Sequence, residues 1–224
     1  MRGARFSGRR EIAIGLAAYA VYQLVRTAVW TDEGRGRARR NAVRILTLEQ
    51  RAGLDVERWA QAAALRAPRL VHALNGGYAV FNVGLTVGWL VSLYVNRDPA
   101  FHRLRRAAVL AFVGAQPAFL LFPTAPPRAL GELVDTLRLS GIDIEHPLLV
   151  RLYNPVSAMP SLHLAFAVLT AGMLAERSGT STGRTAANAY PPLVALVVLA
   201  TGNHYVLDTV AGAGLGALAR RLAG

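Results

Sequence analysis

Two short segments, far apart in the chain, contain the residues best suited to chemistry. One contains Ser161 and His163, and the other contains His204 and Asp208. Each segment stands at the end of an apolar stretch long enough to be a membrane helix, where ionisable side chains are costly and usually functional. Two histidines beside a serine and an aspartate indicate phosphoryl or acyl chemistry.

His204 and Asp208 are four residues apart, so on a helix they share one face. The aspartate can accept a hydrogen bond from one imidazole nitrogen, which leaves the lone pair of the other nitrogen directed outward. A histidine held in this way can attack phosphorus or act as a base. The alternative is a buried polar pair that only holds two helices together.

An anion site is expected where a helix is predicted to open at Pro160. Proline suits a first helical turn, and the free amides of that turn, with Ser161 beside them, favour a phosphate. Arg128 follows two prolines that restrict its backbone, and its planar guanidinium also suits a phosphate. The alternatives are that Ser161 only caps the helix and that Arg128 contacts solvent or lipid head groups.

The elements that would position these residues are apolar helices. The chain has 224 residues, of which 53% are hydrophobic and 17% charged. A helix of about 20 apolar residues crosses the roughly 30 Å of hydrocarbon in a bilayer. We therefore predict six spans, at residues 11–30, 70–95, 104–122, 160–175, 186–201 and 205–222. The first is interpreted as a retained span, because no small-residue cleavage site follows a short apolar core.

Two segments between the spans differ from them in pattern. Residues 36–66 alternate apolar and charged side chains at helical spacing, which predicts an amphipathic surface helix, or two helices broken at Gly53. A solvated helix of a small lobe outside the membrane is the alternative. Residues 123–157 are rich in proline and glycine and predict a long loop of the kind that is usually functional. The predicted fold is all-α, a polytopic six-helix membrane bundle forming one domain, residues 1–224.

Alternating spans determine which segments share a side of the membrane. The surface helix, the proline-rich loop and the starts of the fourth and sixth spans all fall on one side. We therefore expect four side chains to converge there: Arg128, Ser161, His163 and His204. The positive-inside rule, with longer loops counting less, slightly favours an inside amino terminus and an outward-facing site.

Gly212 and Gly216 continue the four-residue spacing that begins at Asp208. Small residues at this spacing let a neighbouring helix approach closely. We predict that this neighbour is the helix that carries His163.

Composition narrows the possible classes of protein. All 25 basic residues are arginine and the formal net charge is +12, but no basic strip with interleaved aromatics indicates a nucleic-acid partner. Arginines between apolar spans are better explained as topology determinants and as contacts to anionic lipid or phosphate. The chain lacks cysteine, the zinc-hydrolase histidine spacing and an acidic cluster placed for magnesium, so neither a metal nor a cofactor is expected.

Three ordered motifs resemble the type 2 phosphatidic acid phosphatase superfamily of membrane phosphatases and phosphotransferases. They are the runs Pro123 to Arg128, Ala158 to His163 and Thr201 to Tyr205, and Asp208 follows the last of them. Together they are similar to the branch that includes inositol phosphorylceramide synthase. The resemblance covers most of the chain from about Glu49 onward.

The resemblance implies a role for each matching residue. His204 would take the phosphoryl group as phosphohistidine, Asp208 would orient it, and His163 would protonate the leaving alcohol. Ser161 and Arg128 would hold the non-bridging oxygens of the phosphate and stabilise charge in the transition state.

The remaining substrate-binding positions are Asn203, within the last motif, and Tyr78, where the branch often has a tyrosine. Asn82 stands where the branch often has a histidine. Val198 replaces an arginine that typical members carry six residues before the nucleophile, and a lysine ahead of Arg128 is also absent. Another basic group is expected to bind the phosphate in place of the missing arginine and lysine, and the candidates are Arg106, Arg105 and Arg151.

The leading hypothesis is a multi-pass cell-membrane phosphatase that acts on a lipid phosphate such as phosphatidic acid or polyprenyl phosphate. The alternative is a phosphotransferase that moves a head-group phosphate, such as inositol phosphate, to a lipid or glycan hydroxyl. A non-catalytic membrane protein whose polar residues pack helices is a third class. An intramembrane serine protease is disfavoured, because Ser161 lacks a Gly-x-Ser-Gly setting.

Overall fold

The structure is a computed structural model in which residues 6–78, 82–141, 143 and 146–224 are described. Within these residues every regular element is a helix, and extended pairing is limited to one bridge between Thr124 and Ser157. The all-α prediction is confirmed.

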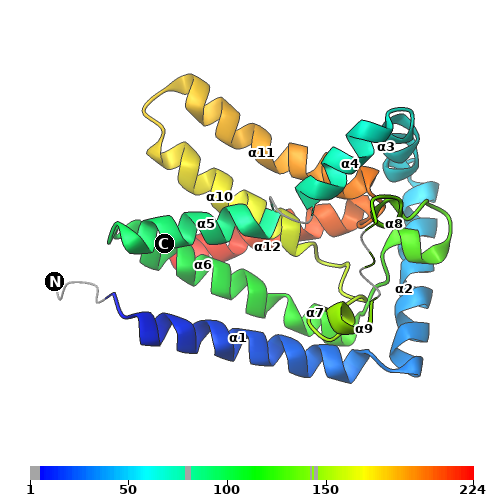
Figure 1. Ribbon diagram of the computed structural model, residues 1–224, viewed down its shortest axis with the longest axis horizontal. Coiled ribbons are helices and arrows are strands. Elements are labelled where there is room, and N and C mark those ends of the chain that lie inside the picture. Colours follow the sequence, from blue (N-terminus) through cyan, green and yellow to red (C-terminus); the bar gives the residue numbers. More distant parts are fainter. Residues whose placement is uncertain (1–5, 79–81, 142, 144–145) are drawn as a thin grey trace.

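The long helices lie roughly side by side, and the start of α1 and the end of α12 lie at the same end of the bundle (Figure 1). α10 occupies the centre and packs against α5, α6, α11 and α12. These bundle helices are α1 (Gly8–Val29), α5 (Asn82–Val95), α6 (Ala100–Gly114), α10 (Leu162–Arg177), α11 (Ser181–Ala200) and α12 (Val206–Ala223).

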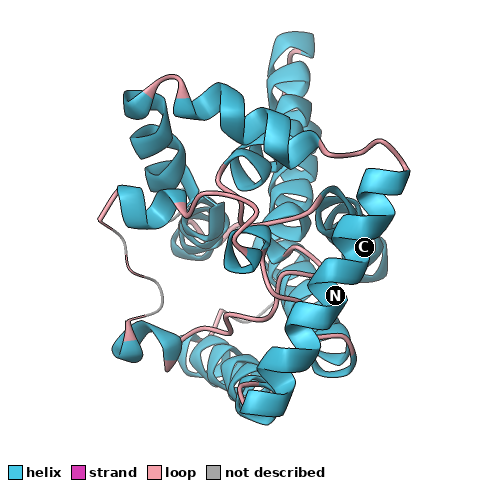
Figure 2. Ribbon diagram, turned by 90° about the vertical axis from the view of Figure 1, so that its right-hand side faces the viewer, coloured by secondary structure: helices cyan, strands magenta, loops and turns pink. Residues whose placement is uncertain are grey.

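The opposite end of the bundle is covered by shorter elements and loops. α2 crosses this end, and a view onto it shows loops running through its middle (Figures 1 and 2). The elements here are α2 (Asp32–Arg51), α3 (Val56–Leu65), α4 (Pro68–Gly76), α7 (Gln116–Leu121), the 3-10 helix η2 (Pro127–Leu130), α8 (Thr136–Leu139) and α9 (Pro147–Val150).

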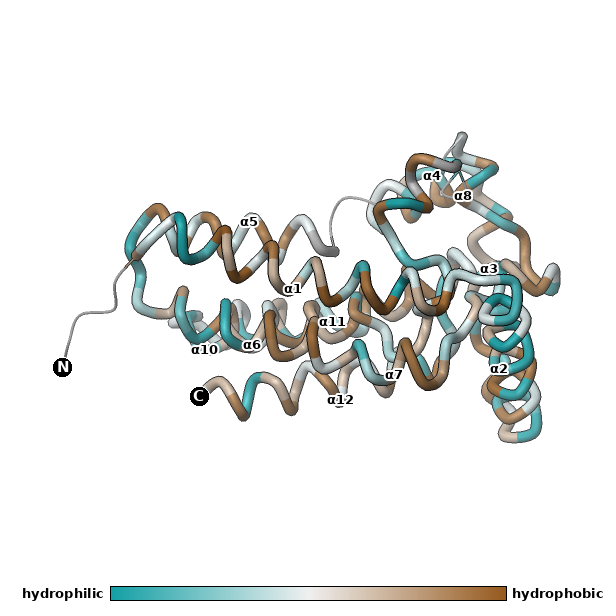
Figure 3. The backbone as a smooth tube through the Cα atoms, turned by 90° about the horizontal axis from the view of Figure 1, so that it is seen from below, coloured by the Kyte–Doolittle hydropathy of each residue, from teal (hydrophilic) through white to brown (hydrophobic). Residues whose placement is uncertain are grey.

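The amphipathic segment forms two helices, as one of the two sequence alternatives anticipated. Thr31 caps α2 by accepting a hydrogen bond from the Gly34 amide at 3.0 Å, and two acids occupy its first turn. Gly53, with φ of +69°, breaks the chain before α3. Figure 3 shows that α2 is largely hydrophilic, in contrast to the apolar middle of α1.

The predicted span at 70–95 is not one helix. It divides into α4, which packs against α3 and α11, and α5, which packs against α6 and α10. α4 ends at Gly76, with Gly77 as its C-cap, and glycine weakens a helix relative to other residues. The side chain of Asn82, just beyond it, lies outside the described residues.

Two helical segments of the described chain are long and apolar enough to cross a membrane. They are Gly8–Val29 and the nearly continuous pair α6 and α7, Ala100–Leu121. The apolar window of α1 is only 11% buried within the protein, so most of its apolar surface lacks a protein partner. Of the six predicted spans, these two therefore meet the limits of length and hydropathy within the described residues.

Gly212 and Gly216 bring α12 against α10, as their spacing predicted. A Cβ added at Gly212 would lie 2.1 Å from the carbonyl oxygen of Ser161, and one at Gly216 would lie 2.5 Å from that of Ala165. Only glycine permits this approach, which places the start of α10 beside the first turns of α12.

Replacing Gly212 with alanine is expected to push α12 away from α10. The added methyl group cannot be accommodated without backbone movement, and overpacking of this kind costs roughly 1–3 kcal/mol. We expect a lower thermal unfolding midpoint in detergent and a lower turnover rate. Gly214→Ala is the matched control, because a Cβ there meets no atom within 4 Å. Equal behaviour of the two variants would contradict the close approach.

Candidate active site

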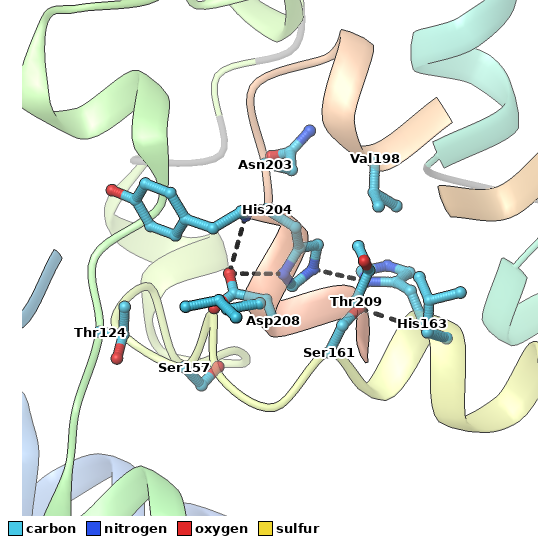
Figure 4. Close-up of polar contacts among 12 residues, drawn as sticks. Thr124, Ser157, Ser161, His163, Val198, Asn203, His204, Asp208 and Thr209 are labelled. Carbon is cyan, nitrogen blue, oxygen red and sulfur yellow. Dashed lines mark hydrogen bonds and ion pairs between the residues drawn. The ribbon is translucent and has the colours of Figure 1, made fainter. Parts of the chain in front are cut away.

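The two histidines of the sequence motifs lie side by side at the loop-covered end of the bundle. His163, in the first turn of α10, places its Nδ1 atom 3.2 Å from Nε2 of His204, which precedes α12. The rings meet edge to face, with their centroids 5.4 Å apart. Figure 4 shows the direct contact between the two imidazole rings.

Asp208 lies on the far side of the His204 ring (Figure 4). Its Oδ2 atom is 3.3 Å from Nδ1 of His204 and also accepts a hydrogen bond from the Tyr205 amide at 3.0 Å. The carboxylate thus caps α12 and holds the imidazole with one oxygen. With Nδ1 as the donor to Asp208, the Nε2 lone pair of His204 faces His163.

The turn between α11 and α12 fixes where His204 stands. Gly202, with φ of +68°, reverses the chain after α11. The amides of Asn203 and His204 then both donate to the carbonyl oxygen of Val198, at 3.0 and 3.2 Å. The backbone of His204 is therefore held by α11 and its side chain by α12.

Arg128 supplies a cation beside this turn. Its amide donates to the Gly202 carbonyl oxygen at 3.0 Å, and its Nε donates to Oδ1 of Asn203 at 2.9 Å. Asp135 lies 3.8 Å from its Nη1. These contacts hold a largely buried guanidinium toward the histidine pair.

A cavity of about 320 Å³ opens onto these groups. Its polar lining includes His163, His204, Arg128 and Asn203, and its apolar lining includes Leu162, Phe112 and Phe166. Tyr78 also lines it and packs its ring 4.7 Å from that of His163. The cavity is polar where the histidines meet and apolar toward the bundle.

Ser161 does not reach the cavity, contrary to the role expected for it. It is fully buried, and its hydroxyl accepts a hydrogen bond from the Leu164 amide at 3.4 Å, as the N-cap of α10. α10 begins at Leu162, so Pro160 precedes the cap and does not stand in the first turn. The close approach of Gly212 covers Ser161, which explains its burial.

The three arginines expected to replace the missing basic residues do not line the cavity either. Arg105 pairs with Glu11, 3.3 Å away, and Arg106 donates to the carbonyl oxygen of Ala223 at 3.4 Å, near the other end of the bundle. Arg151 is exposed. Val198, at the position where typical family members have an arginine, is fully buried in an apolar cluster with Leu164. Among the described lining residues, Arg128 is the one permanent cation.

Two glutamates of the surface helices lie under the start of α12 and were not anticipated. Glu49 is fully buried, and its Oε1 accepts a hydrogen bond from the Leu207 amide at 2.6 Å. Glu57 is 1% exposed. In the sequence, both glutamates belong to the charged side chains of the amphipathic segment at residues 36–66. A signal was present, because Ala38, Ala42, Ile45 and Glu49 follow one helical stripe.

Burial controls the protonation of this glutamate pair. Burial, together with the nearby carboxylates of Glu57 and Asp208, raises the pKa of Glu49 to about 8 against the lowering effect of the Leu207 amide. Burial also raises the pKa of Glu57. With both pKa values raised, protonation of the pair reduces the negative charge close to Asp208.

Comparison with known families agrees with this geometry. The sequence model of the PAP2 superfamily matches residues 43–222. The chain belongs to the PAP2 superfamily. This membership supports an enzyme with phosphatase-type phosphoesterase activity.

The part of the chain that the PAP2 model matches contains both histidines, Asp208, Arg128 and the two buried glutamates, whereas α1 precedes it. Neither the comparison with curated proteins nor that with solved structures gave a match.

Glu49→Ala is expected to lower both stability and turnover of this PAP2 protein. The change leaves the Leu207 amide buried without its acceptor, which costs on the order of 1–3 kcal/mol, and loosens the turn that carries Asp208. Glu49→Gln keeps an acceptor and is expected to restore most of the turnover. Exposed Glu33→Gln is the control.

The same variants test the raised pKa of Glu49. The folded protein binds the Glu49 proton more tightly than the unfolded chain does. Its contribution to stability is therefore full below the ordinary pKa of 4.5 and is lost as the pH rises through about 8. We expect thermal unfolding midpoints measured across this range to fall less in Glu49→Gln than in the wild type. An identical decline in both would refute the assignment.

Proposed function

We propose that this protein is a multi-pass membrane phosphatase that hydrolyses a lipid phosphate through a phosphohistidine on His204. The observation that carries the proposal is the aligned series Asp208, His204 and His163, with separations of 3.3 and 3.2 Å, at a cavity that also receives Arg128. A nucleophile, its orienting carboxylate, a proton donor and a cation are the parts that phosphoryl transfer requires.

The proposed reaction has two steps. Nε2 of His204 attacks phosphorus, the bond to the lipid oxygen breaks, and protonated His163 gives its proton to that oxygen. Water then attacks the phosphohistidine and gives a proton back to His163, and the bond between nitrogen and phosphorus breaks. Arg128 stabilises the negative charge on the phosphate oxygens in both steps, and Asp208 stabilises the positive charge on the phosphorylated ring.

The surroundings of the cavity support a lipid as the substrate. Phe112 and Phe166 line it on the bundle side, so a phosphate at the histidines can keep an apolar tail among the helices. α1 and the α6 and α7 pair have the length and hydropathy of membrane spans. The six apolar segments and the surface position of α2 and α3 complete the proposed cell-membrane arrangement.

A phosphotransferase is the second candidate, because the motifs are similar to the branch that includes inositol phosphorylceramide synthase. The first step would be the same. In the second, the hydroxyl of a lipid or glycan would attack the phosphohistidine in place of water.

His204→Ala is expected to reduce turnover of phosphatidic acid in mixed micelles by several orders of magnitude, because the attacking atom is lost. Exposed His72→Ala, on α4, is the control. Phosphate release without an added acceptor supports the phosphatase, and strict dependence on an acceptor supports the transferase. Turnover that survives in His204→Ala would rule out both.

We expect wild-type turnover to persist in the presence of a chelator.

The membrane arrangement can be tested separately with single cysteines, since the chain has none. Ala129 is exposed beside the site, and Asn96 is exposed in the turn between α5 and α6, at the other end of the bundle. An impermeant thiol reagent should label Ala129→Cys in intact cells and Asn96→Cys only after permeabilisation. The reverse pattern would invert the orientation, and equal labelling of both would contradict a membrane-spanning bundle.

A further inference from the structure

A second cavity, of about 350 Å³, lies between α1 and the helices α5, α6 and α10. Its lining is largely apolar and includes Leu90 and Val109. Phe112 and Phe166 line both this groove and the catalytic cavity. The two spaces therefore adjoin at these two rings.

The groove exists because α1 contacts the other helices near its two ends and has small side chains, Gly15 and Ala18, facing the groove between them. At one end the ring of Phe6 packs 5.7 Å from that of Tyr94. Near the other end, Nε of Arg26 donates to the carbonyl oxygen of Tyr153 at 3.0 Å. Between these attachments, a Cβ added at Gly15 would meet no atom within 4 Å.

The polar groups at the groove contact one another: the threonines through their hydroxyls, and Glu11 and Arg105 through an ion pair. Oγ1 of Thr86 lies 2.9 Å from Oγ1 of Thr170, and Arg105 pairs with Glu11 at the end remote from the histidines. A polar ligand group placed here would lose its hydrogen bonds to water, which is costly. A hydrocarbon chain would lose none.

We propose that this groove binds the hydrocarbon tail of the substrate whose phosphate is held at His204. The inference rests on the proposed function and specifies where the substrate lies. Glu11 and Tyr19 mark the two ends of the groove along α1 and are about 12 Å apart at 1.5 Å per residue, somewhat less than half of a bilayer's hydrocarbon thickness. Because α1 precedes the residues that the PAP2 model matches, one wall of the groove comes from a helix outside that part of the chain.

Gly15→Phe tests the groove by filling it. Exposed Gly88→Phe, on α5, is the matched control, because a Cβ there also meets no atom within 4 Å. Using full-length protein in detergent, we expect Gly15→Phe to lower kcat/KM for hexadecyl phosphate by about tenfold or more, with hydrolysis of p-nitrophenyl phosphate changed by less than about twofold. An unchanged ratio between the two substrates would mean that only bilayer lipid fills the groove.

A second measurement does not depend on turnover. A single-chain alkyl phosphate with a diazirine in the middle of its tail, irradiated with the wild-type protein, should label residues 11–19 of α1. Labelling confined to other helices would overturn the proposal. Loss of p-nitrophenyl phosphate hydrolysis in His204→Ala tests the phosphatase separately, so failure of the groove and failure of the proposed function give different results.

Discussion

The site depends on one carboxylate oxygen. Oδ2 of Asp208 accepts a hydrogen bond from the Tyr205 amide and lies beside Nδ1 of His204, so the start of α12 and the orientation of the imidazole are set by the same atom. An aspartate with no exposed surface is costly unless its neighbours satisfy it. The Tyr205 amide and the His204 ring satisfy Oδ2, whereas Oδ1 is buried without a hydrogen-bond partner among the described residues.

α12 is held from two sides. Gly212 lets its first turns contact the backbone of Ser161, which sets the distance between α12 and the start of α10, where His163 lies. From the other side, Glu49 of α2 accepts the Leu207 amide, and burial gives the glutamate a proton near neutral pH. α2 thus supports the start of α12, and protonation of Glu49 limits the negative charge beside Asp208.

Much of the site could be predicted from the sequence, because its signals are local. The four-residue spacing of Gly212 and Gly216 describes one face of α12. The spacing of His204 and Asp208 also predicted their contact, although His204 lies just before α12 and not on a face of it. The boundaries of the long helices followed from runs of apolar residues. The break between α4 and α5 was missed, because hydropathy alone does not show where a helix divides.

Contacts between segments that are distant in the chain could not be predicted from local spacing. Ser161 matched a phosphate-binding position, yet packing against α12 covers it and leaves its hydroxyl as a helix cap. Arg105 was a plausible replacement cation, but it pairs with Glu11 across the bundle. Side chains of either kind are placed by tertiary packing, which spacing along the chain does not reveal. The same limit applies to the groove beside α1.

The central claim is that His204 becomes phosphorylated. The most direct measurement is to mix the purified protein with a lipid phosphate, quench at alkaline pH, where phosphohistidine survives, and map the phosphorylated peptide by mass spectrometry. The account predicts phosphate on His204. Phosphate on Ser161, or product release with no phosphorylated residue at any time, would contradict it.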